Sequence, residues 1–229
     1  MWLQTGVEAG YSNEIMEGDN MEESKHIELN EAKWDGWVDS LDKKGLRSYY
    51  LRHGQRDVIS ILNIREGMSI LDIGCGTGWA LGQAASLINN KGSFYGVDLS
   101  AKMIERAKEN FKTKENFYFI KANAESIPLD DNLFDFIICT NSFHHYFNPD
   151  KALKEMQRLL KTGGRVYILE SNADIWIIKI IDKLAKLFGH GHVKFYNSKE
   201  FEELMVGAGL KYEGYKPNRY SQKVQVGEK

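Results

Sequence analysis

The sequence has little of several features that mark particular classes of protein. Its 229 residues include only two cysteines and three prolines, so a disulfide scaffold, a fibrous protein and a wholly disordered chain are not expected. No apolar run approaches the roughly 20 residues that span a bilayer, and the first residues lack the basic start and apolar stretch of a signal peptide. Together these absences predict a soluble protein of a reducing, cytoplasmic compartment.

The sequence also has no excess of basic over acidic residues. Lysine and arginine number 30 against 32 acidic residues, a net charge of −2, which argues against a generally basic nucleic-acid-binding surface. The acids gather in residues 1–33, whose net charge of −6 leaves +4 for the rest of the chain. Because this segment has little apolar periodicity, it is predicted to be a mobile or loosely docked arm.

From residue 69 onward, short apolar segments alternate with helical patterns. An aromatic stretch over residues 34–63 also reads as helical. The alternation predicts a parallel sheet with helices on both faces, and a chain of this size suits one domain. The predicted strands are 69–73, 93–98, 117–121, 134–140, 165–169 and two more within 211–226, and the predicted helices are 77–88, 101–111, 149–160, 173–189 and 198–208.

A glycine-rich turn, Gly74-Cys75-Gly76-Thr77-Gly78, follows the first predicted strand. Glycines there let the backbone approach a ligand at the edge of the sheet where ligands bind. A dinucleotide fingerprint needs its third glycine at the sixth position, which is Trp79 here. Asp72 precedes the turn, and its carboxylate would repel a pyrophosphate and suit a ligand with an ammonium group.

The segment Asp-Ile-Gly-Cys-Gly-Thr-Gly resembles the first motif of class I S-adenosylmethionine (SAM)-dependent methyltransferases. Five further segments resemble other parts of this family: residues 65–68 before the first strand, 97–100, 123–129, 142–145 and 160–164. The last two are similar to its small-molecule branch called type 11. The resemblance covers most of residues 45–229. It implies a Rossmann-like, doubly wound seven-stranded sheet whose last strand is antiparallel.

The resemblance also implies a domain division and a set of contacts to SAM. Residues 1–44 would be an acidic arm and the start of a lid, and 45–229 the methyltransferase domain with a lid insertion near 171–195. Asp98 follows the glycine turn by about 20 residues, where a carboxylate accepts bonds from ribose hydroxyls. The expected cofactor-binding residues are Asp72, Gly74, Cys75, Gly76, Gly78, Asp98, Leu99, Asn123, Ala124, Glu125 and Asn141. Asn123 stands where the family usually has an aspartate that accepts from the adenine amino group, a bond that an amide oxygen can also accept.

Chemistry at the acceptor has fewer candidates. The methyl sulfonium is already activated, so an enzyme must align the acceptor and exclude water. A hydroxyl or a carbon acid also needs a general base. His144 and His145 follow the fourth strand and are candidates for it, although a packing role for the pair is an open alternative. No metal is expected, because the His190-Gly191-His192 segment lacks an acid or cysteine to complete a site.

Two segments have apolar surface available to cover the cofactor. Residues 173–189 are apolar except for one stripe of lysines and an aspartate, which suits a cap over a hydrophobic pocket, a dimer surface, a membrane-surface helix or a core helix. The aromatic N-terminal stretch is expected to meet this helix as a lid. The expected substrate and lid residues are Trp34, Trp37, Tyr49, Tyr50, His53 and Trp176.

The sequence thus predicts a methyltransferase that acts on an O, N or C atom of a small, partly hydrophobic molecule. A monomer or homodimer is expected, with no nucleic-acid partner and no stable membrane insertion. A non-catalytic SAM-binding protein and a nicotinamide-dependent oxidoreductase are the alternatives. A nucleic-acid methyltransferase is disfavoured because no Asn-Pro-Pro-Tyr-like motif follows the fourth strand and no basic domain is appended.

Overall fold

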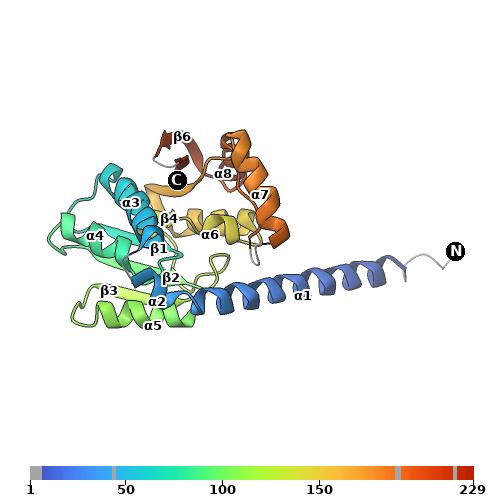
Figure 1. Cartoon of the computed structure of the whole chain (residues 1–229), viewed down its shortest axis with the longest axis horizontal. Helices are drawn as coiled ribbons and strands as arrows, with labels where there is room; N and C mark the ends of the chain where they lie inside the picture. Colours follow the sequence, from blue (N-terminus) through green and yellow to red (C-terminus); the bar gives the residue numbers. More distant parts are fainter. Residues whose placement is uncertain (1–6, 43–44, 189–191, 219–220) are drawn as a thin grey trace.

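The computed structural model of the chain describes residues 7–42, 45–188, 192–218 and 221–229. At its centre is a seven-stranded sheet of order β3-β2-β1-β4-β5-β7-β6 (Figure 1). Neighbours among the first five strands pair in parallel, whereas β7 is antiparallel to both β5 and β6. The strands are β1 (Ser69–Ile73), β2 (Ser93–Asp98), β3 (Phe117–Lys121), β4 (Phe134–Thr140), β5 (Leu160–Ser171), β6 (Lys211–Pro217) and β7 (Gln222–Glu228). The Rossmann-like, mostly parallel sheet predicted from the sequence is confirmed.

Helices cover both faces of the sheet because residues of each central strand point alternately to its two sides. In β1, Ile70 faces one hydrophobic cluster while Leu71 and Ile73 face the other. The first cluster includes side chains of α3 (Leu46–Ile61), α4 (Trp79–Leu87) and α5 (Ala101–Asn110). The second includes side chains of α6 (Pro149–Leu159) and α8 (Ser198–Gly207). This layering leaves the carboxyl ends of the parallel strands open for a site.

Three sequence predictions differ from the structure in their boundaries. The helical stretch 34–63 is divided among the end of α1 (Val7–Asp35), α2 (Val38–Asp42) and α3, with Gly45 extended at the start of α3. The fifth strand begins at Leu160 rather than at residue 165, because a register shift beside β4 keeps it paired past its glycines. The helix predicted over 173–189 is α7 (Trp176–Phe188), and residue 189 lies outside the described residues.

The acidic N-terminal segment, for which the sequence predicted a mobile or loosely docked arm, is helical over α1. Helix α1 extends well beyond the body of the molecule (Figure 1). Its later half contacts the body through polar groups: Glu31 pairs with Lys121, and the Asp35 carboxylate accepts a bond from the hydroxyl of Ser100. Such contacts need no apolar stripe, which is why hydrophobic periodicity did not reveal this helix.

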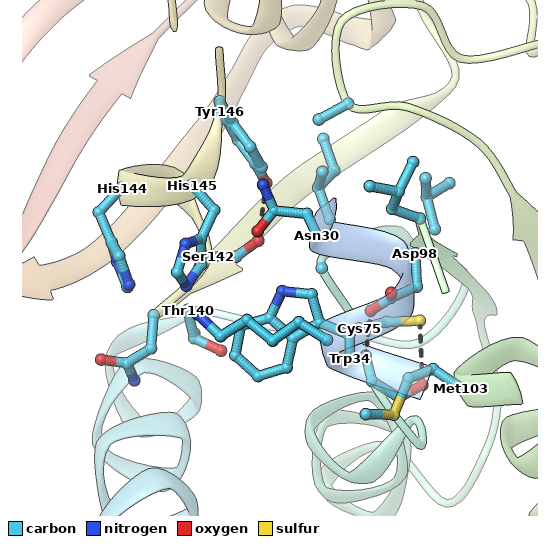
Figure 2. Close-up of a pocket in the computed structure, with 18 of the residues that line it drawn as sticks. Asn30, Trp34, Cys75, Asp98, Met103, Thr140, Ser142, His144, His145 and Tyr146 are labelled. Carbon is cyan, nitrogen blue, oxygen red and sulfur yellow. Dashed lines mark hydrogen bonds between the residues drawn. The ribbon is translucent and has the colours of Figure 1, made fainter. Parts of the chain in front are cut away.

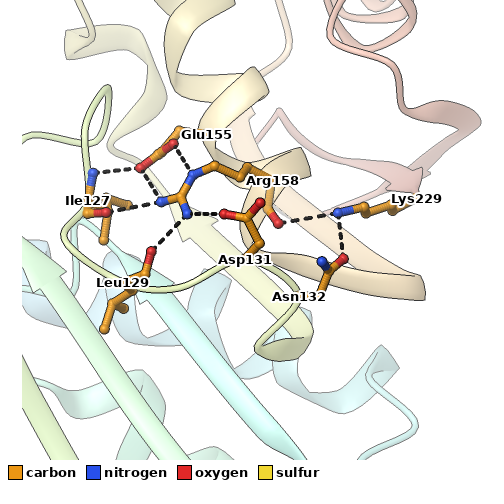
Figure 3. A network of polar contacts seen from close by, with 7 residues as sticks. All are labelled: Ile127, Leu129, Asp131, Asn132, Glu155, Arg158 and Lys229. Atoms are coloured by element: carbon orange, nitrogen blue, oxygen red, sulfur yellow. Dashed lines mark hydrogen bonds and ion pairs between the residues drawn. The ribbon is translucent and has the colours of Figure 1, made fainter.

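A polar network holds the loop between β3 and β4. The guanidinium of Arg158 in α6 donates to the carbonyl oxygens of Ile127 and Leu129, at 3.1 and 2.8 Å, and pairs with Glu155 and Asp131 (Figure 3). Those pairs raise the pKa of Arg158, so its charge is permanent. The loop between β3 and β4, which contains the predicted cofactor-binding residues Asn123 and Ala124, is therefore held against α6 by hydrogen bonds and ion pairs.

Candidate functional site

A cavity of about 500 Å³ opens at the carboxyl ends of the central strands. One wall consists of the turn after β1, the ends of β2 and β4, and the loop after β3. The opposite wall comes from α1, α3 and the segment that follows α7. In Figure 2, Asp98 and Cys75 lie at one end of this cavity, and His144 and His145 lie at the other.

The glycines of the turn have different roles. Gly76 lines the cavity with a positive φ of 52°, and a Cβ there would approach only the Leu41 side chain, at 3.7 Å. Gly76 thus leaves open space that a ligand can fill. Gly74 also lines the cavity, but a Cβ on it would collide with Ser142. A Cβ on Gly78 would meet the rings of Phe111 and Phe119, at 2.9 and 3.0 Å, so that glycine serves packing and lies away from the cavity.

Asp98 combines a structural role with an open position. Its carboxylate accepts hydrogen bonds from the backbone N–H of Gly76 at 2.8 Å and of Ser100 at 2.9 Å. Burial raises the pKa of Asp98, and these N–H donors partly offset the effect. Each carboxylate oxygen has a further lone pair, and the side chain lines the cavity. The geometry therefore fits a group that offers two hydroxyls, as the ribose of SAM does.

Asp72 lies behind the glycine turn rather than in the cavity wall. It is fully buried, and neither of its oxygens has a hydrogen-bond partner within the described part of the chain. Burial, with a smaller contribution from the charge of Asp98, raises the pKa of Asp72 to about 8. Burial thus favours the uncharged form of this carboxyl group. Because Asp72 is not among the residues that line the cavity, the structure does not support the expected direct contact between Asp72 and the cofactor.

The other predicted cofactor residues line the cavity, but several already have partners. The Asn123 Oδ1 accepts from the Glu125 N–H at 3.1 Å, and the Glu125 carboxylate accepts two bonds from Asn148 at the start of α6. Asn141 has a positive φ of 54° and a buried Nδ2 with no partner among the described residues. Leu99 and Ala124 complete this wall. Asn141 thus borders the cavity with its Oδ1 bonded to Gln222 and with an amide nitrogen that has no partner among the described residues.

Cys75 lines the cavity but does not provide a nucleophile. The side chain is almost completely buried, and burial raises the pKa of its thiol well above the ordinary value. It therefore remains a neutral thiol at physiological pH. Its position against the cavity indicates a packing contact.

The two adjacent histidines have different surroundings. His144 donates from Nδ1 to the Glu170 carboxylate at 2.8 Å, and that carboxylate is only 3% exposed at the end of β5. His145 stacks edge-on to Trp34 of α1 at 5.2 Å, and its backbone carbonyl lies 2.7 Å from the His26 Nε2. When the imidazole is neutral, this hydrogen bond to the carboxylate leaves Nε2 of His144 as the acceptor nitrogen. Of the two candidates, His144 has the arrangement of a general base.

A second histidine–carboxylate pair follows α7. His192 lies 5.4 Å from His144 between ring centroids, and its Nε2 donates to Asp182 at 2.9 Å. The Asp182 oxygen also accepts from the Phe195 N–H at 2.6 Å. Burial lowers the pKa of His192. His190 and Gly191, the other residues of the possible metal motif, lie outside the described residues.

The predicted lid residues fall into two groups. Trp34 and Tyr50 line the cavity, and Trp37 packs against Trp34 at 6.1 Å without lining it. Tyr49 and His53 instead stack on each other at 3.8 Å, with Tyr49 55% exposed. Trp176 is 70% exposed and points to solvent. Among the described side chains of α7, Ala185 lines the cavity, and His192 and Phe195 line it from the segment after the helix.

Several residues of the cavity escaped the sequence analysis. The α1 residues His26, Ile27, Asn30 and Lys33 line it together with Trp34. Their spacing places them on one helix face, which is a usable signal only once the segment is known to be helical. Gln55 of α3 donates to Thr140 at 3.2 Å, and Glu170 supports His144 from a strand 26 residues later. These partners are distant in sequence and leave no local pattern.

Comparisons with known proteins identify the family to which the chain is similar. A family model described as a methyltransferase domain matches residues 64–209. A protein of Shewanella sp. (strain W3-18-1) named ubiquinone/menaquinone biosynthesis C-methyltransferase UbiE is 28% identical over 156 residues, covering 62% of this chain and 61% of that protein. A demethylmenaquinone methyltransferase of Staphylococcus epidermidis is 34% identical over 119 residues, covering 52% of this chain and 49% of that protein. The chain thus spans less than two thirds of the length of these relatives.

A solved structure supports the fold. A SAM-dependent methyltransferase from Aquifex aeolicus superposes with a TM-score of 0.68 at 22% identity, covering 84% of this chain and 97% of that one. Within the described residues, no helix combines the length and apolar character needed to cross a bilayer.

Proposed function

The chain belongs to the methyltransferase-domain family, and from this premise we propose that it uses SAM to methylate a small, partly hydrophobic acceptor held beside His144. One observation carries the proposal: a single cavity is lined by Asp98 at one end and by His144, which Glu170 holds from behind, at the other (Figure 2). A cofactor and an acceptor can therefore lie end to end within it.

The cofactor end suits SAM through residues of this chain. Asp98 would accept from the ribose hydroxyls, Leu99 and Ala124 would flank the adenine, and Asn141 would lie near the methionine end. When bound, the cofactor supplies a methyl group already activated on sulfur. Gly76 leaves the backbone close to it without a side chain in the way.

The acceptor end suits a molecule that must lose a proton. His144 Nε2 would take that proton from an O–H, N–H or C–H of the acceptor while Glu170 stabilises the imidazolium that forms. Apolar side chains of Ile27, Trp34 and Phe195 line the same region, which favours a partly hydrophobic acceptor and excludes water. The C-methyltransferase named among the relatives supports a carbon acceptor as one form of this proposal.

Two measurements test the two ends. Calorimetry should detect binding of SAM or S-adenosylhomocysteine and none of NAD, and tight NAD binding without a SAM signal would overturn the cofactor assignment. Transfer of a radiolabelled methyl group to a panel of phenols, carbon acids and amines, each in polar and alkylated forms, tests the acceptor. We expect the alkylated forms to be preferred, and transfer only to the polar ones contradicts the proposed pocket.

A further inference from the structure

Helix α7 turns its apolar face outward. Five of its large apolar side chains are each 46% to 70% exposed, namely Trp176, Ile177, Ile180, Ile181 and Leu184. In an α-helix these positions form one continuous face. Scattered exposed apolar residues are ordinary, but a continuous face of this kind marks a surface that binds something.

The attachment of α7 to the body leaves this face uncovered. Asp182, on the opposite side, bonds to His192 and to the Phe195 N–H, which ties the helix to the segment after it. Among the described elements, none packs extensively against α7. Figure 1 shows it at the periphery of the molecule. The inner side therefore anchors the helix, and the outer side is available to a partner.

The charges beside this face indicate which partner fits. Lys179 and Lys183 are exposed and follow one edge of the apolar face, together with Lys186, which also pairs with Asp182. The whole chain is slightly acidic, with a net charge of −2, so this edge is a local exception. A basic edge beside an apolar face with a tryptophan is the pattern of helices that lie in the headgroup region of anionic membranes.

The size of the face argues against a stable pairing of two copies through α7 alone. A helix of 13 residues is about 20 Å long and about 10 Å wide, so its face covers on the order of 200 Å². A standard protein interface buries about 800 Å² on each partner. A lipid surface has no such minimum, because binding there increases with each apolar side chain that enters it.

We propose that α7 binds reversibly to an anionic lipid surface through Trp176, Ile180 and Leu184, with the neighbouring lysines contacting the headgroups. Ala185 on the same helix lines the cavity, so binding would bring the acceptor end of the cavity next to the lipid. This surface does not depend on the proposed reaction, since lipid binding is measured without cofactor or acceptor.

Co-sedimentation with large unilamellar vesicles tests the proposal. The full chain should bind vesicles of phosphatidylcholine and phosphatidylglycerol in equal parts, and bind pure phosphatidylcholine at least tenfold more weakly. Ile180→Glu should lower the partition coefficient tenfold or more. Lys179→Gln combined with Lys183→Gln should lower it several-fold and reduce its dependence on salt.

A matched variant distinguishes binding through α7 from nonspecific binding through any exposed apolar residue. Val206→Glu in α8 makes the same change in charge at an apolar residue that is 59% exposed, and it should leave binding unchanged. Thermal melting should show that all variants remain folded. The proposal fails if the full chain does not bind the anionic vesicles, or if Val206→Glu weakens binding as much as Ile180→Glu. It also fails if sedimentation reveals a dimer that Ile180→Glu dissociates while vesicle binding is absent.

Discussion

The two ends of the cavity are built in different ways. At the cofactor end, the polar groups lie within a few residues of strand ends, as Gly76 and Asp98 do after β1 and β2. At the acceptor end, they come from segments far apart in the chain: the His26 ring reaches His145 across 119 residues, and Glu170 reaches His144 across 26. The first end depends on the sheet alone, whereas the second depends on how α1 and the later segments dock on it.

This difference predicts that variants at the acceptor end lower kcat without changing cofactor affinity, whereas variants at the cofactor end lower cofactor affinity. His144→Ala removes the proposed base and should lower kcat by about 10²–10⁴-fold, while S-adenosylhomocysteine affinity measured by calorimetry stays unchanged. Glu170→Gln should reduce kcat less and shift the pH dependence of kcat, because it alters the environment of His144 without removing it. His53→Ala, which lies away from the cavity, is the matched control. A normal kcat in His144→Ala would exclude this histidine as the base.

Asp98→Ala tests the cofactor end, where the expected effect is on cofactor affinity. Loss of charge-assisted bonds to the ribose should weaken cofactor binding by about 1.5–3 kcal/mol, or roughly 10- to 150-fold in Kd. The overall fold should persist, since Asp98 stands at a strand end. Asp130→Ala, an exposed acid in the loop after β3, should leave calorimetric affinity unaltered. An unchanged Kd in Asp98→Ala would remove Asp98 from the site.

Asp72, which is buried behind the glycine turn, should make the free energy of unfolding depend on pH. Its pKa is raised to about 8 in the folded chain, above the ordinary unfolded value, so the folded state keeps a proton that the unfolded state releases. Its contribution to stability is therefore full below about pH 4 and is lost as the pH rises toward 8. Asp72→Asn should reduce the decline in stability across this range, by up to about 1.4 kcal/mol per pH unit.

Urea unfolding of the native chain and of Asp72→Asn at pH 5, 6, 7 and 8 measures this effect. Equal pH dependence in the two proteins would show that Asp72 is not the group responsible. Binding of a cofactor with an ammonium group should also shift the titration of Asp72 if the two interact through the glycine turn.

The smallest expected effect concerns the wall formed by α1. Trp34→Ala should raise the KM for a partly hydrophobic acceptor by up to about tenfold, because it removes an apolar wall and leaves the cofactor contacts intact. Trp176→Ala should leave the KM for a water-soluble acceptor unchanged, since that side chain faces solvent. Equal effects in the two variants would mean that both tryptophans meet at the cavity as a lid, as the sequence alone suggested.

The domain division proposed from the sequence also receives a test from α1. The helix supplies His26, Asn30 and Trp34 to the cavity, so we propose that residues 1–44 act as a lid over residues 45–229. Deleting them should leave a folded chain that still binds S-adenosylhomocysteine and has lost turnover. Loss of folding would assign the segment to the core. Hydrogen exchange in the full chain should show protection of α1 when the cofactor binds.

Local patterns in the sequence were sufficient for the central sheet and for the cofactor end. The apolar runs that became β1 to β4, the glycines at 74 and 76, and Asp98 are all recognisable because strand period, turn chemistry and motif spacing act over a few residues. The capping box of Asn197 and Glu200 at the start of α8 is another such local feature. Each of these features is decided by neighbours along the chain.

Only the tertiary structure decided which partner each side chain contacts. The periodicity of residues 173–189 indicated a helix with an apolar face, but whether Trp176 covers the cavity or points to solvent depends on how α7 is anchored through Asp182. Glu170 became the partner of His144 because β4 and β5 are adjacent in the sheet. A helix or strand pattern specifies which side chains share a side, whereas the partner on that side is set by packing between segments that the sequence separates.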